Sequence, residues 1–346
     1  MVPIPSEPEH AERPSPVGIT VIVTAYRRYD YLRKAVESAL TQTAPRSSYE
    51  ILVVKDRPEP DLDRWLAEQN VEVVNSDLPR IGQMIAEGVR RARHEVVCFL
   101  DDDDQYLPHK LLTVRQEFER TPDLVLFRHG LIPVDRAGEP DRAWSRVHTV
   151  CRDSFDLTSN DPWPRSLARI FRQGLYVNMT TMSVRREVLR SSIDLIEKID
   201  AAPDTTVGVV AWTHPGIHRF ARDCLSLYRI HDSMSHRVVE GSLAPSHRDL
   251  RRTLRSLEVV GDWIAQPTYR RNAPLAYHLW EAHYLAGVNH AFVEGVGRRP
   301  SLSEWLGFGW SSGLRQQPFI FRDFVRSLPK LASLPRVPAP DPGVIG

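Results

Sequence analysis

The sequence contains few cysteines and no long hydrophobic run. Its 346 residues include three cysteines, Cys98, Cys151 and Cys224, which are far apart and show neither metal-site spacing nor a disulfide framework. No stretch reaches the ~18 apolar residues of a transmembrane helix. Residues 1–17 are rich in proline and charge and lack the apolar core of a signal peptide. We therefore expect a soluble protein of the reducing cytoplasm.

An excess of charge of one sign is also absent. The formal net charge is +1, which argues against a nucleic-acid-binding protein that relies on bulk positive charge. The hydrophobic share of 42% and the charged share of 26% are those of an ordinary globular protein. The length suffices for one large domain, or for one domain with an appendage.

The first half of the chain alternates predicted strands and helices. Buried strands are predicted from β-branched and apolar runs, and the segments between them carry apolar residues at helical spacing. This alternation predicts an α/β fold with a largely parallel sheet and helices on both faces, whose ligands bind at the carboxyl ends of the strands. The expected strands are 19–24, 50–55, 71–74, 96–100 and 124–127, with a helix after Asp30, a second over 81–92 and a third that Pro108 opens.

The second half is less regular. We expect strands over 177–184 and 224–230 and a mainly helical pattern from about residue 246. The predicted organisation is a flexible N-terminus (1–17), a main domain (18–240) that divides at residue 125 into two halves, a helical region (241–333) and a flexible tail (334–346). In the helical region, residues 322–331 form a basic amphipathic stretch that Pro329 interrupts. Peripheral membrane contact there is one reading, and packing against the main domain is the favoured one.

Four consecutive carboxylates follow the predicted strand over 96–100. Asp101, Asp102, Asp103 and Asp104 repel one another unless a cation lies between them, and oxygen ligands suit Mg²⁺ or Mn²⁺. One or two carboxylates, with phosphates completing the coordination, is the usual way in which a protein holds a metal on a nucleotide. The alternative is a solvated acidic turn that stabilises the start of the next helix. The position after a buried strand favours the metal site.

Four segments, in order, resemble glycosyltransferase family 2: VIVTAYRRYDYLRKAVESALTQT, EILVVKD, RRARHEVVCFLDDDDQYLPHKL and LYRIHDSMS. The resemblance covers roughly residues 18–236, and its most specific parts are the opening segment and FLDDDD. It implies the GT-A fold, a Rossmann-like, mostly parallel sheet, with the helical region added at the C-terminus. It also implies a nucleotide-diphosphate sugar as donor, a divalent metal (Mn²⁺ or Mg²⁺) and inversion at the anomeric carbon by direct displacement. Residues 18–125 would then bind the nucleotide, and residues 126–240 the acceptor.

The resemblance also assigns residues to the metal and the diphosphate. Asp101 and Asp103 match the two carboxylates of the family's DxD motif, and both are expected at the metal. Asp101 and its neighbour Asp102 are also expected at the donor nucleotide. His231 matches a histidine that in some relatives contacts the metal or the diphosphate, and a neutral imidazole is a possible Mn²⁺ ligand. A structural role for His231 is the alternative.

Further positions match the part of the family that binds the nucleoside. A carboxylate at Asp56 commonly contacts the base, although the family often has two acidic residues where this chain has Lys55 and Asp56. Arg80 precedes a helix at a point where a basic side chain often reaches the nucleotide, and a surface charge is the alternative. The end of the first strand, which lies against the nucleobase in the family, is formed by Thr24, Ala25 and Tyr26.

The general base is expected from the second half, because the metal occupies the DxD carboxylates. A carboxylate opposite the leaving group would take the acceptor's proton. In the family this residue precedes the strand that matches LYRIH, and Asp204 is the best match here, with Asp200 a near competitor. The family's Glu-Asp pair is absent, since Pro203 stands in place of the Glu. Asp204 as a helix cap is the alternative.

Other functions fit less well. A sugar nucleotidyltransferase would carry a glycine-rich phosphate loop after the first strand, where this chain has TAYRRYD. No Walker motif is present, and the acidic turn lacks the spaced ligands of a calcium loop. An inactive, transferase-like scaffold stays open. The acceptor is a saccharide, lipid, peptide or natural product, the default donor is a UDP-sugar, and the C-terminal helices are a candidate homodimer interface.

Overall fold

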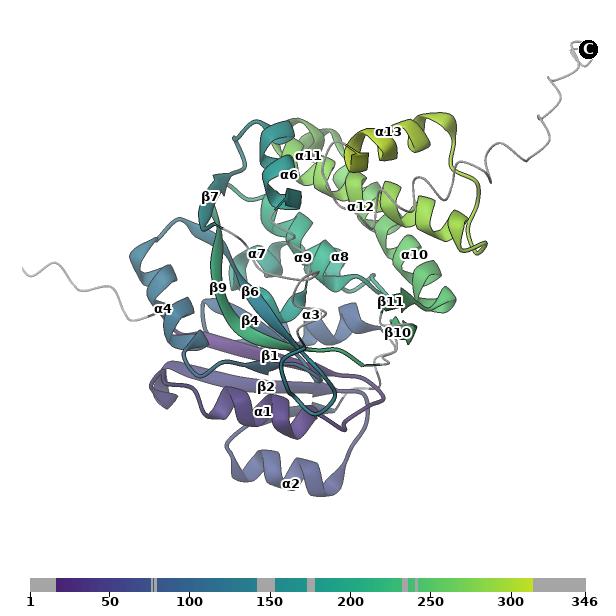
Figure 1. Ribbon diagram of the computed structural model, residues 1–346. Helices are drawn as coiled ribbons and strands as arrows, with labels where there is room; N and C mark the ends of the chain where they lie inside the picture. The colour runs from purple at the N-terminus through teal and green to yellow at the C-terminus, as the bar shows by residue number, and fades with distance from the viewer. Residues whose placement is uncertain are drawn as a thin grey trace, which may run out of the picture.

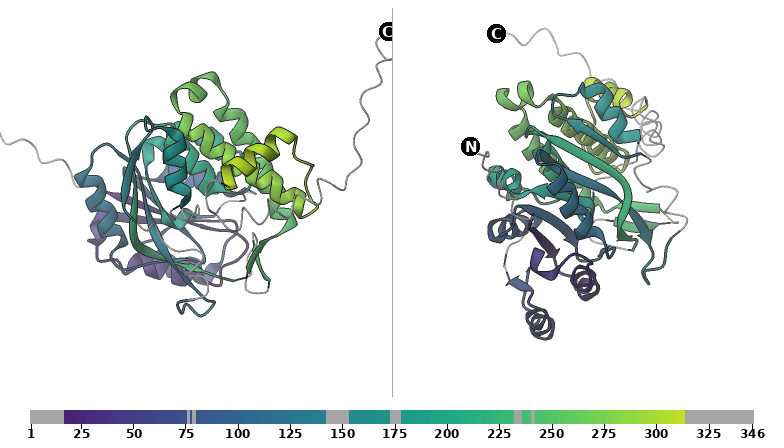
Figure 2. Two further views of the ribbon diagram at one scale, coloured as in Figure 1. Left: turned by 45° about the horizontal axis from the view of Figure 1, so that its top comes forward. Right: turned by 90° about the vertical axis from the view of Figure 1, so that its left-hand side faces the viewer.

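The computed structural model describes residues 17–75, 77, 80–141, 153–172, 178–231, 236–239 and 242–313. A central sheet runs through the molecule, with helices on both sides and a group of C-terminal helices above it (Figure 1). The side view shows the helices in layers around the sheet (Figure 2). The architecture is the mixed α/β fold that the alternation of elements predicts, with added C-terminal helices.

The central sheet has the strand order β3-β2-β1-β4-β8-β6-β9-β5, and β7 pairs with β9. The first four strands of this order are parallel, β8 is antiparallel to both of its neighbours, and β6 and β9 are again parallel. The strands of the central sheet are β1 (Ile19–Ala25), β2 (Tyr49–Lys55), β3 (Glu72–Asn75), β4 (Val96–Asp101), β5 (Gln105–Tyr106), β6 (Leu124–Val134), β7 (Phe155–Thr158), β8 (Met182–Arg185) and β9 (Ile217–Arg229), and a separate hairpin pairs β10 (His236–Val239) with β11 (Ser242–Pro245).

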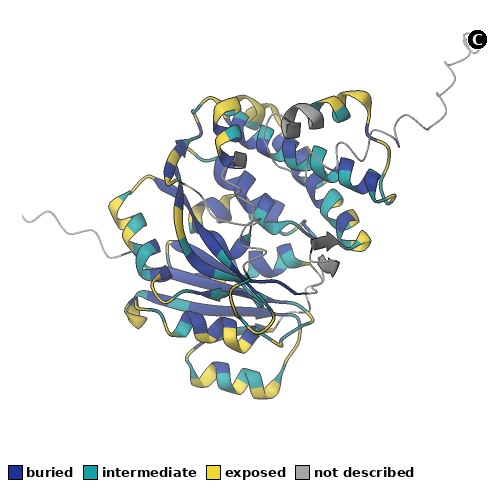
Figure 3. Cartoon of the chain, in the orientation of Figure 1, coloured by how far each residue is buried: buried dark blue, intermediate teal, exposed yellow. Residues whose placement is uncertain are grey.

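Two hydrophobic clusters cover the two faces of the sheet, because alternate residues of each strand point to opposite faces. Val97 and Phe99 of β4 belong to one cluster and Cys98 and Leu100 to the other. Figure 3 shows the strands buried and the outer helix faces exposed. The helices are α1 (Leu32–Leu40), α2 (Pro60–Glu68), α3 (Ile81–Arg91), α4 (Lys110–Arg120), α6 (Trp163–Arg172), α7 (Arg186–Ser191), α8 (Ile193–Ile196), α9 (Pro203–Trp212), α10 (His247–Ile264), α11 (Pro267–Asn272), α12 (Pro274–Val293) and α13 (Leu302–Gly313).

The C-terminal helices share a core with the sheet. Val260 and Ile264 of α10 and Leu275 of α12 are buried in the same cluster as residues of α3, α7 and α9. Helices α10 and α12 contact each other, and they also contact α8 and α9, respectively. The C-terminal region therefore packs against the face of the sheet that carries α9. Among the described residues, no helix is long and apolar enough to span a bilayer.

Several elements differ from the sequence-based expectations. Strands β6 and β9 are longer than predicted, and helix α2 was not predicted. Pro108 does not open α4, since that helix begins at Lys110, and Tyr31, not Asp30, occupies the N-cap position of α1. In place of the strand predicted over 177–184, the described residues form the 3₁₀ turn η2 (Met179–Thr181) and the short strand β8. The expected tails and the basic stretch 322–331 lie outside the described residues, and the domain boundaries stay predictions.

Candidate active site

The carboxyl ends of β1, β2 and β4 meet at one edge of the sheet. Thr24 of β1 pairs in register with Asp101 of β4, and Ala25 pairs with Lys55 of β2. Asp56 follows directly after Lys55, so the donor-site residues predicted on three separate segments lie at neighbouring strand ends. Figure 1 shows these strands adjacent in the sheet. The parallel register, rather than any sequence proximity, brings these residues together.

Asp56 holds the loop that follows β1. Its Oδ1 accepts a hydrogen bond from the Arg27 backbone N–H at 3.0 Å and another from the Tyr29 hydroxyl. Burial alone would raise the pKa of Asp56, but these hydrogen bonds leave it below its ordinary value. Arg27 has a positive φ of 62°, a conformation that L-residues other than Asn and Asp seldom adopt. The ionised Asp56 thus supports a tightly bent loop beside Tyr26.

Two of the four consecutive aspartates are anchored from inside the protein. Asp104 is 1% exposed, and its Oδ1 accepts a hydrogen bond from the Arg229 backbone N–H at 3.0 Å. The Asp101 N–H donates to Thr180 Oγ1 at 3.1 Å, and Asp101 Oδ2 lies 3.3 Å from the same hydroxyl. The Thr180 carbonyl in turn accepts a hydrogen bond from Lys110 Nζ at 2.5 Å. Turn η2 and helix α4 therefore hold the acidic segment, residues Asp101–Asp104, in position.

The other two aspartates, Asp102 and Asp103, both contact Arg28 of the loop after β1. Arg28 Nη2 lies 3.2 Å from Asp102 Oδ1 and 2.5 Å from Asp103 Oδ2. The Nε2 atom of His231 lies 2.9 Å from the same Asp103 oxygen. The acidic segment thus contacts residues from both halves of the chain, and the role of His231 at a metal or diphosphate stays a prediction.

These contacts shift the pKa values of the carboxylates in different directions. Burial, and then repulsion from its neighbours, raises the pKa of Asp101 and that of Asp102 well above the ordinary value. For Asp103, burial is opposed by hydrogen bonds and charge attraction from His231 and Arg28, and its pKa is lowered. Ionisation of Asp101 and Asp102 is therefore unfavourable in the protein alone, and a bound cation would stabilise their charged forms.

The chemistry of this donor set fits a divalent cation. Asp101, Asp102 and Asp103 supply carboxylate oxygens. The buried Oδ1 of Asn178 has no hydrogen-bond partner among the residues that the structure describes, although its Nδ2 lies 3.4 Å from Asp104 Oδ2. Within the described ranges, no three His, Cys, Asp or Glu side chains already form a metal-binding group. This arrangement suits a cation held by one or two carboxylates and completed by a substrate's phosphates rather than a closed protein site.

Asp204 lies in the first turn of α9, directly after Pro203. Its Oδ1 accepts a hydrogen bond from the Thr205 N–H at 2.8 Å. Burial raises the pKa of Asp204 to about 6, and its charge contributes to the raised pKa of Asp101. The charges of Asp204 and Asp101 therefore interact, and the pKa of Asp204 suits a general base near neutral pH.

Arg80 and Asp200, which the sequence placed in different roles, form an ion pair. Arg80 Nε lies 3.1 Å from Asp200 Oδ1, and Arg252 of α10 donates to the Asp200 backbone carbonyl. Asp200 is therefore committed to joining the start of α3 to the C-terminal helices. Asp204, which no ion pair of the described residues engages, is the better placed of the two carboxylates to accept a proton.

Four residues of the site have no separate sequence signal. Arg28, Asn178 and Thr180 contact the acidic segment from remote parts of the chain, and fully buried Lys110 supports Thr180. Arg229 of β9 donates to the backbone carbonyls of Asp103, Asp135 and Arg136. Lys110 could have been noticed as one of the few lysines in an arginine-rich chain, but nothing in its neighbours reveals its burial.

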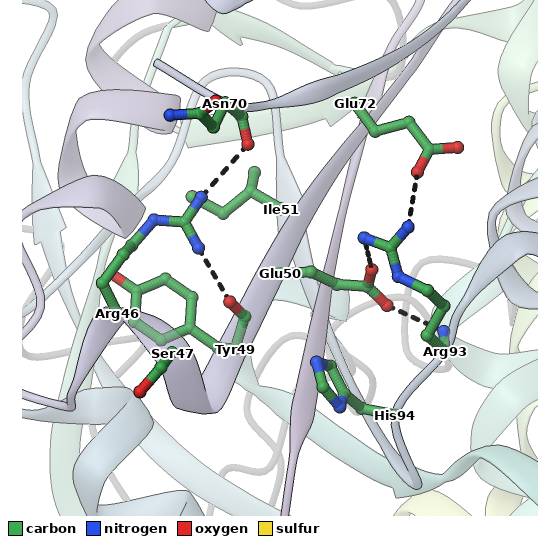
Figure 4. A pocket seen from close by; sticks show the side chains of 9 residues that line it. All are labelled: Arg46, Ser47, Tyr49, Glu50, Ile51, Asn70, Glu72, Arg93 and His94. Atoms are coloured by element: carbon green, nitrogen blue, oxygen red, sulfur yellow. Dashed lines mark hydrogen bonds and ion pairs between the residues drawn. The ribbon is translucent and has the colours of Figure 1, made fainter.

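A surface depression of about 400 Å³ lies at the other end of the strands (Figure 4). Its polar groups are engaged with one another: Arg46 donates to the carbonyls of Tyr49 and Asn70, and Arg93 pairs with Glu50 and Glu72. Ligands of parallel sheets bind at the carboxyl ends, whereas this depression adjoins the amino ends of β2 and β3. We therefore place the active site at the acidic segment.

Comparisons with known proteins agree with this geometry. A family model described as "Glycosyl transferase family 2" matches residues 20–192. An uncharacterized glycosyltransferase of Nostoc sp., alr2836, is 28% identical over 230 residues, covering 63% of this chain and 66% of the relative. Protein CgeD of Bacillus subtilis is 25% identical over 135 residues, covering 35% of this chain and 31% of CgeD. The chain thus spans less than two thirds of the length of these curated relatives.

Solved structures share the fold at low sequence identity. S. aureus TarS 1–349, crystallised with UDP-GlcNAc, matches with a TM-score of 0.56 and 15% identity, covering 90% of this chain and 88% of the TarS chain. The mannosyltransferase PcManGT of Pyrobaculum calidifontis, in complex with GDP-Man and Mn²⁺, matches with a TM-score of 0.50 and 14% identity, covering 93% and 88%. Sheet, acidic strand end and family match agree: the chain belongs to glycosyltransferase family 2.

Proposed function

We propose that this protein is an inverting glycosyltransferase that transfers a sugar from a nucleotide-diphosphate sugar to an acceptor hydroxyl. One observation carries the proposal. The parallel register brings Thr24, Asp56 and Asp101 to one edge of the sheet, and Asp204, with a pKa raised to about 6, lies within electrostatic reach of that edge. A nucleotide site and a candidate base are therefore adjacent.

In the proposed reaction the donor lies along the ends of β1 and β4. Thr24, Ala25 and Tyr26 contact the nucleobase, with Asp56 beside them, and Arg80 stays a candidate nucleotide contact that must first leave Asp200. Asp101 and Asp102 face the ribose and diphosphate. Asp101, Asp103 and His231 would hold a divalent cation, which when bound offsets the charge that develops on the leaving diphosphate.

Asp204 then activates the acceptor. Its carboxylate takes the proton of the acceptor hydroxyl while that oxygen forms a bond to the anomeric carbon. The bond between the anomeric carbon and the diphosphate oxygen breaks in the same step, and its electron pair leaves with the nucleoside diphosphate. Attack from the face opposite the leaving group inverts the configuration at the anomeric carbon.

The donor nucleotide is proposed to be UDP, with GDP as the second choice. The TarS complex contains UDP-GlcNAc and the PcManGT complex contains GDP-Man, so related folds accommodate both nucleotides. The acceptor end is proposed to lie toward α10. Asp249 in the first turn of α10 has a pKa raised by burial to about 6, and its charge acts on Asp204.

Self-association through the C-terminal helices is a further proposal. Leu302 and Leu306 of α13 are 72% and 55% exposed and lie one helical turn apart, which leaves an apolar strip on the surface. Light scattering of the wild-type protein and of a Leu302→Ser, Leu306→Ser double variant tests this. A dimer in the wild type that becomes a monomer in the variant supports the proposal, whereas a monomeric wild type contradicts it.

A donor screen tests the enzymatic function. We expect the protein with Mn²⁺ to release nucleoside diphosphate from one of a set of UDP- and GDP-sugars, and EDTA to abolish the release. Asp204→Asn should keep donor binding and lose release. Binding without release from any donor, with a range of sugar acceptors present, would indicate the inactive scaffold instead.

A further inference from the structure

Arg28 lies on the same carboxylate oxygens that the proposed cation would use. Its guanidinium contacts Asp102 Oδ1 at 3.2 Å and Asp103 Oδ2 at 2.5 Å, and its side chain is 23% exposed. Arg28 follows β1 in the loop that Asp56 and Tyr29 hold in place. The chain therefore presents a cation of its own, from a well-supported loop, to the two central carboxylates of the acidic segment.

The contact with Arg28 determines which ring nitrogen of His231 carries the proton. Arg28 Nη1 lies 3.5 Å from His231 Nδ1, and His231 Nε2 lies 2.9 Å from Asp103 Oδ2. A guanidinium only donates hydrogen bonds, so Nδ1 must accept, and Nε2 must carry the proton that it donates to Asp103. A nitrogen that carries a proton has no lone pair for a metal. The Arg28 contact and metal binding through Nε2 therefore exclude each other.

We propose that Arg28 is a built-in counter-cation, which neutralises Asp102 and Asp103 in the donor-free protein and yields them to the divalent cation when the donor binds. The inference rests on the proposed function. The released guanidinium then binds the donor's diphosphate, because its planar fork matches phosphate oxygens as well as carboxylates. Metal binding and nucleotide binding are thereby linked: the cation alone must displace Arg28 without compensation, whereas the cation with diphosphate gives Arg28 a new partner.

The linkage predicts opposite effects of Arg28→Gln on two affinities. Without nucleotide, the variant should bind Mn²⁺ at least tenfold more tightly than the wild type, because no positive charge competes for the carboxylates. With Mn²⁺ present, it should bind UDP or GDP at least tenfold more weakly, because the diphosphate loses its arginine. Mn²⁺ binding is measured from the electron paramagnetic resonance signal of the free ion, and nucleotide binding by calorimetry. Neither measurement requires turnover.

Two further variants make the test specific. Arg28→Lys keeps the charge but not the fork, so Mn²⁺ binding without nucleotide should stay within threefold of the wild type while nucleotide binding weakens. Arg33→Gln is the matched control, since Arg33 lies five residues on, exposed on α1 with its guanidinium over the Trp65 ring. It should change neither affinity.

The possible outcomes test the inference separately from the proposed function on which it rests. Unchanged or weaker binding of Mn²⁺ alone by Arg28→Gln, in a protein that melts cooperatively, overturns the inference and leaves the proposed function intact. Should Arg28→Gln not fold, Arg28→Lys decides: Mn²⁺ binding far from the wild-type value, or nucleotide binding that does not weaken, overturns the inference. A wild-type protein that binds neither Mn²⁺ nor any nucleoside diphosphate overturns the proposed function and the inference with it.

Discussion

Replacing Asp204 by asparagine is expected to abolish transfer and, at the same time, to stabilise the folded protein above pH 6. Burial raises the pKa of Asp204 to about 6 from an ordinary value of 3.8. As pH rises through this window, the unfolded chain releases the proton first, so stability falls until the folded carboxyl also ionises. The whole difference is worth at most about 3 kcal/mol, at ~1.36 kcal/mol per pH unit.

Asparagine keeps the shape of the side chain and its ability to accept a hydrogen bond from the Thr205 N–H, but it carries no charge. We therefore expect Asp204→Asn to raise the free energy of unfolding at pH 8 by about 1–3 kcal/mol and to leave it unchanged near pH 3. Loss of the base should lower kcat by roughly 10²–10⁴-fold. In the wild type, kcat/KM should fall tenfold per pH unit below about pH 6, since the protonated base is inactive.

Denaturant unfolding at pH 3 and pH 8, together with a nucleoside-diphosphate release assay across pH, measures all of these effects. Asp61→Asn is the matched control, because Asp61 follows Pro60 in the first turn of α2 as Asp204 follows Pro203 in α9, yet its side chain is 95% exposed. The control should change neither stability by more than about 0.5 kcal/mol nor activity. Transfer by Asp204→Asn within a few-fold of the wild-type rate, or destabilisation at pH 8, would refute the reasoning.

Three further predictions concern the acidic segment. Asp103→Asn should abolish Mn²⁺-dependent binding of nucleotide; unchanged calorimetric affinity would contradict its role. Mn²⁺ should raise the melting temperature more at pH 8 than at pH 5, and EDTA should reverse the gain. The reason is that burial raises the pKa of Asp101 and that of Asp102, so that their ionisation destabilises the metal-free fold. An equal effect at both pH values would count against this. Thr180→Val should destabilise the protein by about 1–3 kcal/mol, since the Asp101 N–H loses its acceptor, and should weaken nucleotide binding with Mn²⁺. Denaturant unfolding measures the first effect and calorimetry the second. No change in either would contradict a positioning role for Thr180.

The parallel half of the sheet could be predicted because its signals are local. Each of β1, β2, β3 and β4 is a short apolar run that turn residues or a helix follows, and the alternation with helices dictates parallel pairing. The rule that ligands bind at carboxyl ends then predicted that Thr24, Asp56 and Asp101 would lie together. The register Thr24–Asp101 and Ala25–Lys55 confirms this proximity. Their contacts with a donor stay predictions.

The second half was harder because its strands pair over long distances and without a fixed order. Strand β8 inserts antiparallel between β4 and β6, and β9 pairs with β6, β5 and β7 along its length. Such pairings follow from the packing of the whole molecule rather than from any local pattern. The length of β9 was therefore missed. Helix α2 lies in the first half and was missed for a different reason, since its Pro60 and Asp61 start signal was present in the sequence but was not used.

The contacts of the acidic segment escaped prediction for the same reason. Arg28 and His231 are separated by 203 positions in the chain, and Asp101 and Thr180 by 79. Sequence reasoning assigned the charge of the segment correctly but had no means of finding its counter-charge. Arg229 is a further example, since its guanidinium donates to the backbone carbonyls of Asp103 and Asp135, which are far away in the chain.

The four aspartates at the end of β4 differ in the protein groups that contact them. Asp104 is buried and accepts a hydrogen bond from the Arg229 N–H, so its carboxylate fastens β9 to the acidic segment. Asp102 and Asp103 share Arg28, Asp103 also contacts His231, and no ion pair reaches Asp101 within the described part of the chain. Stability alone would favour neutral residues at these three positions, since an unpaired buried charge is costly. The divalent cation of the proposed function would supply the positive charge that stabilises these carboxylates.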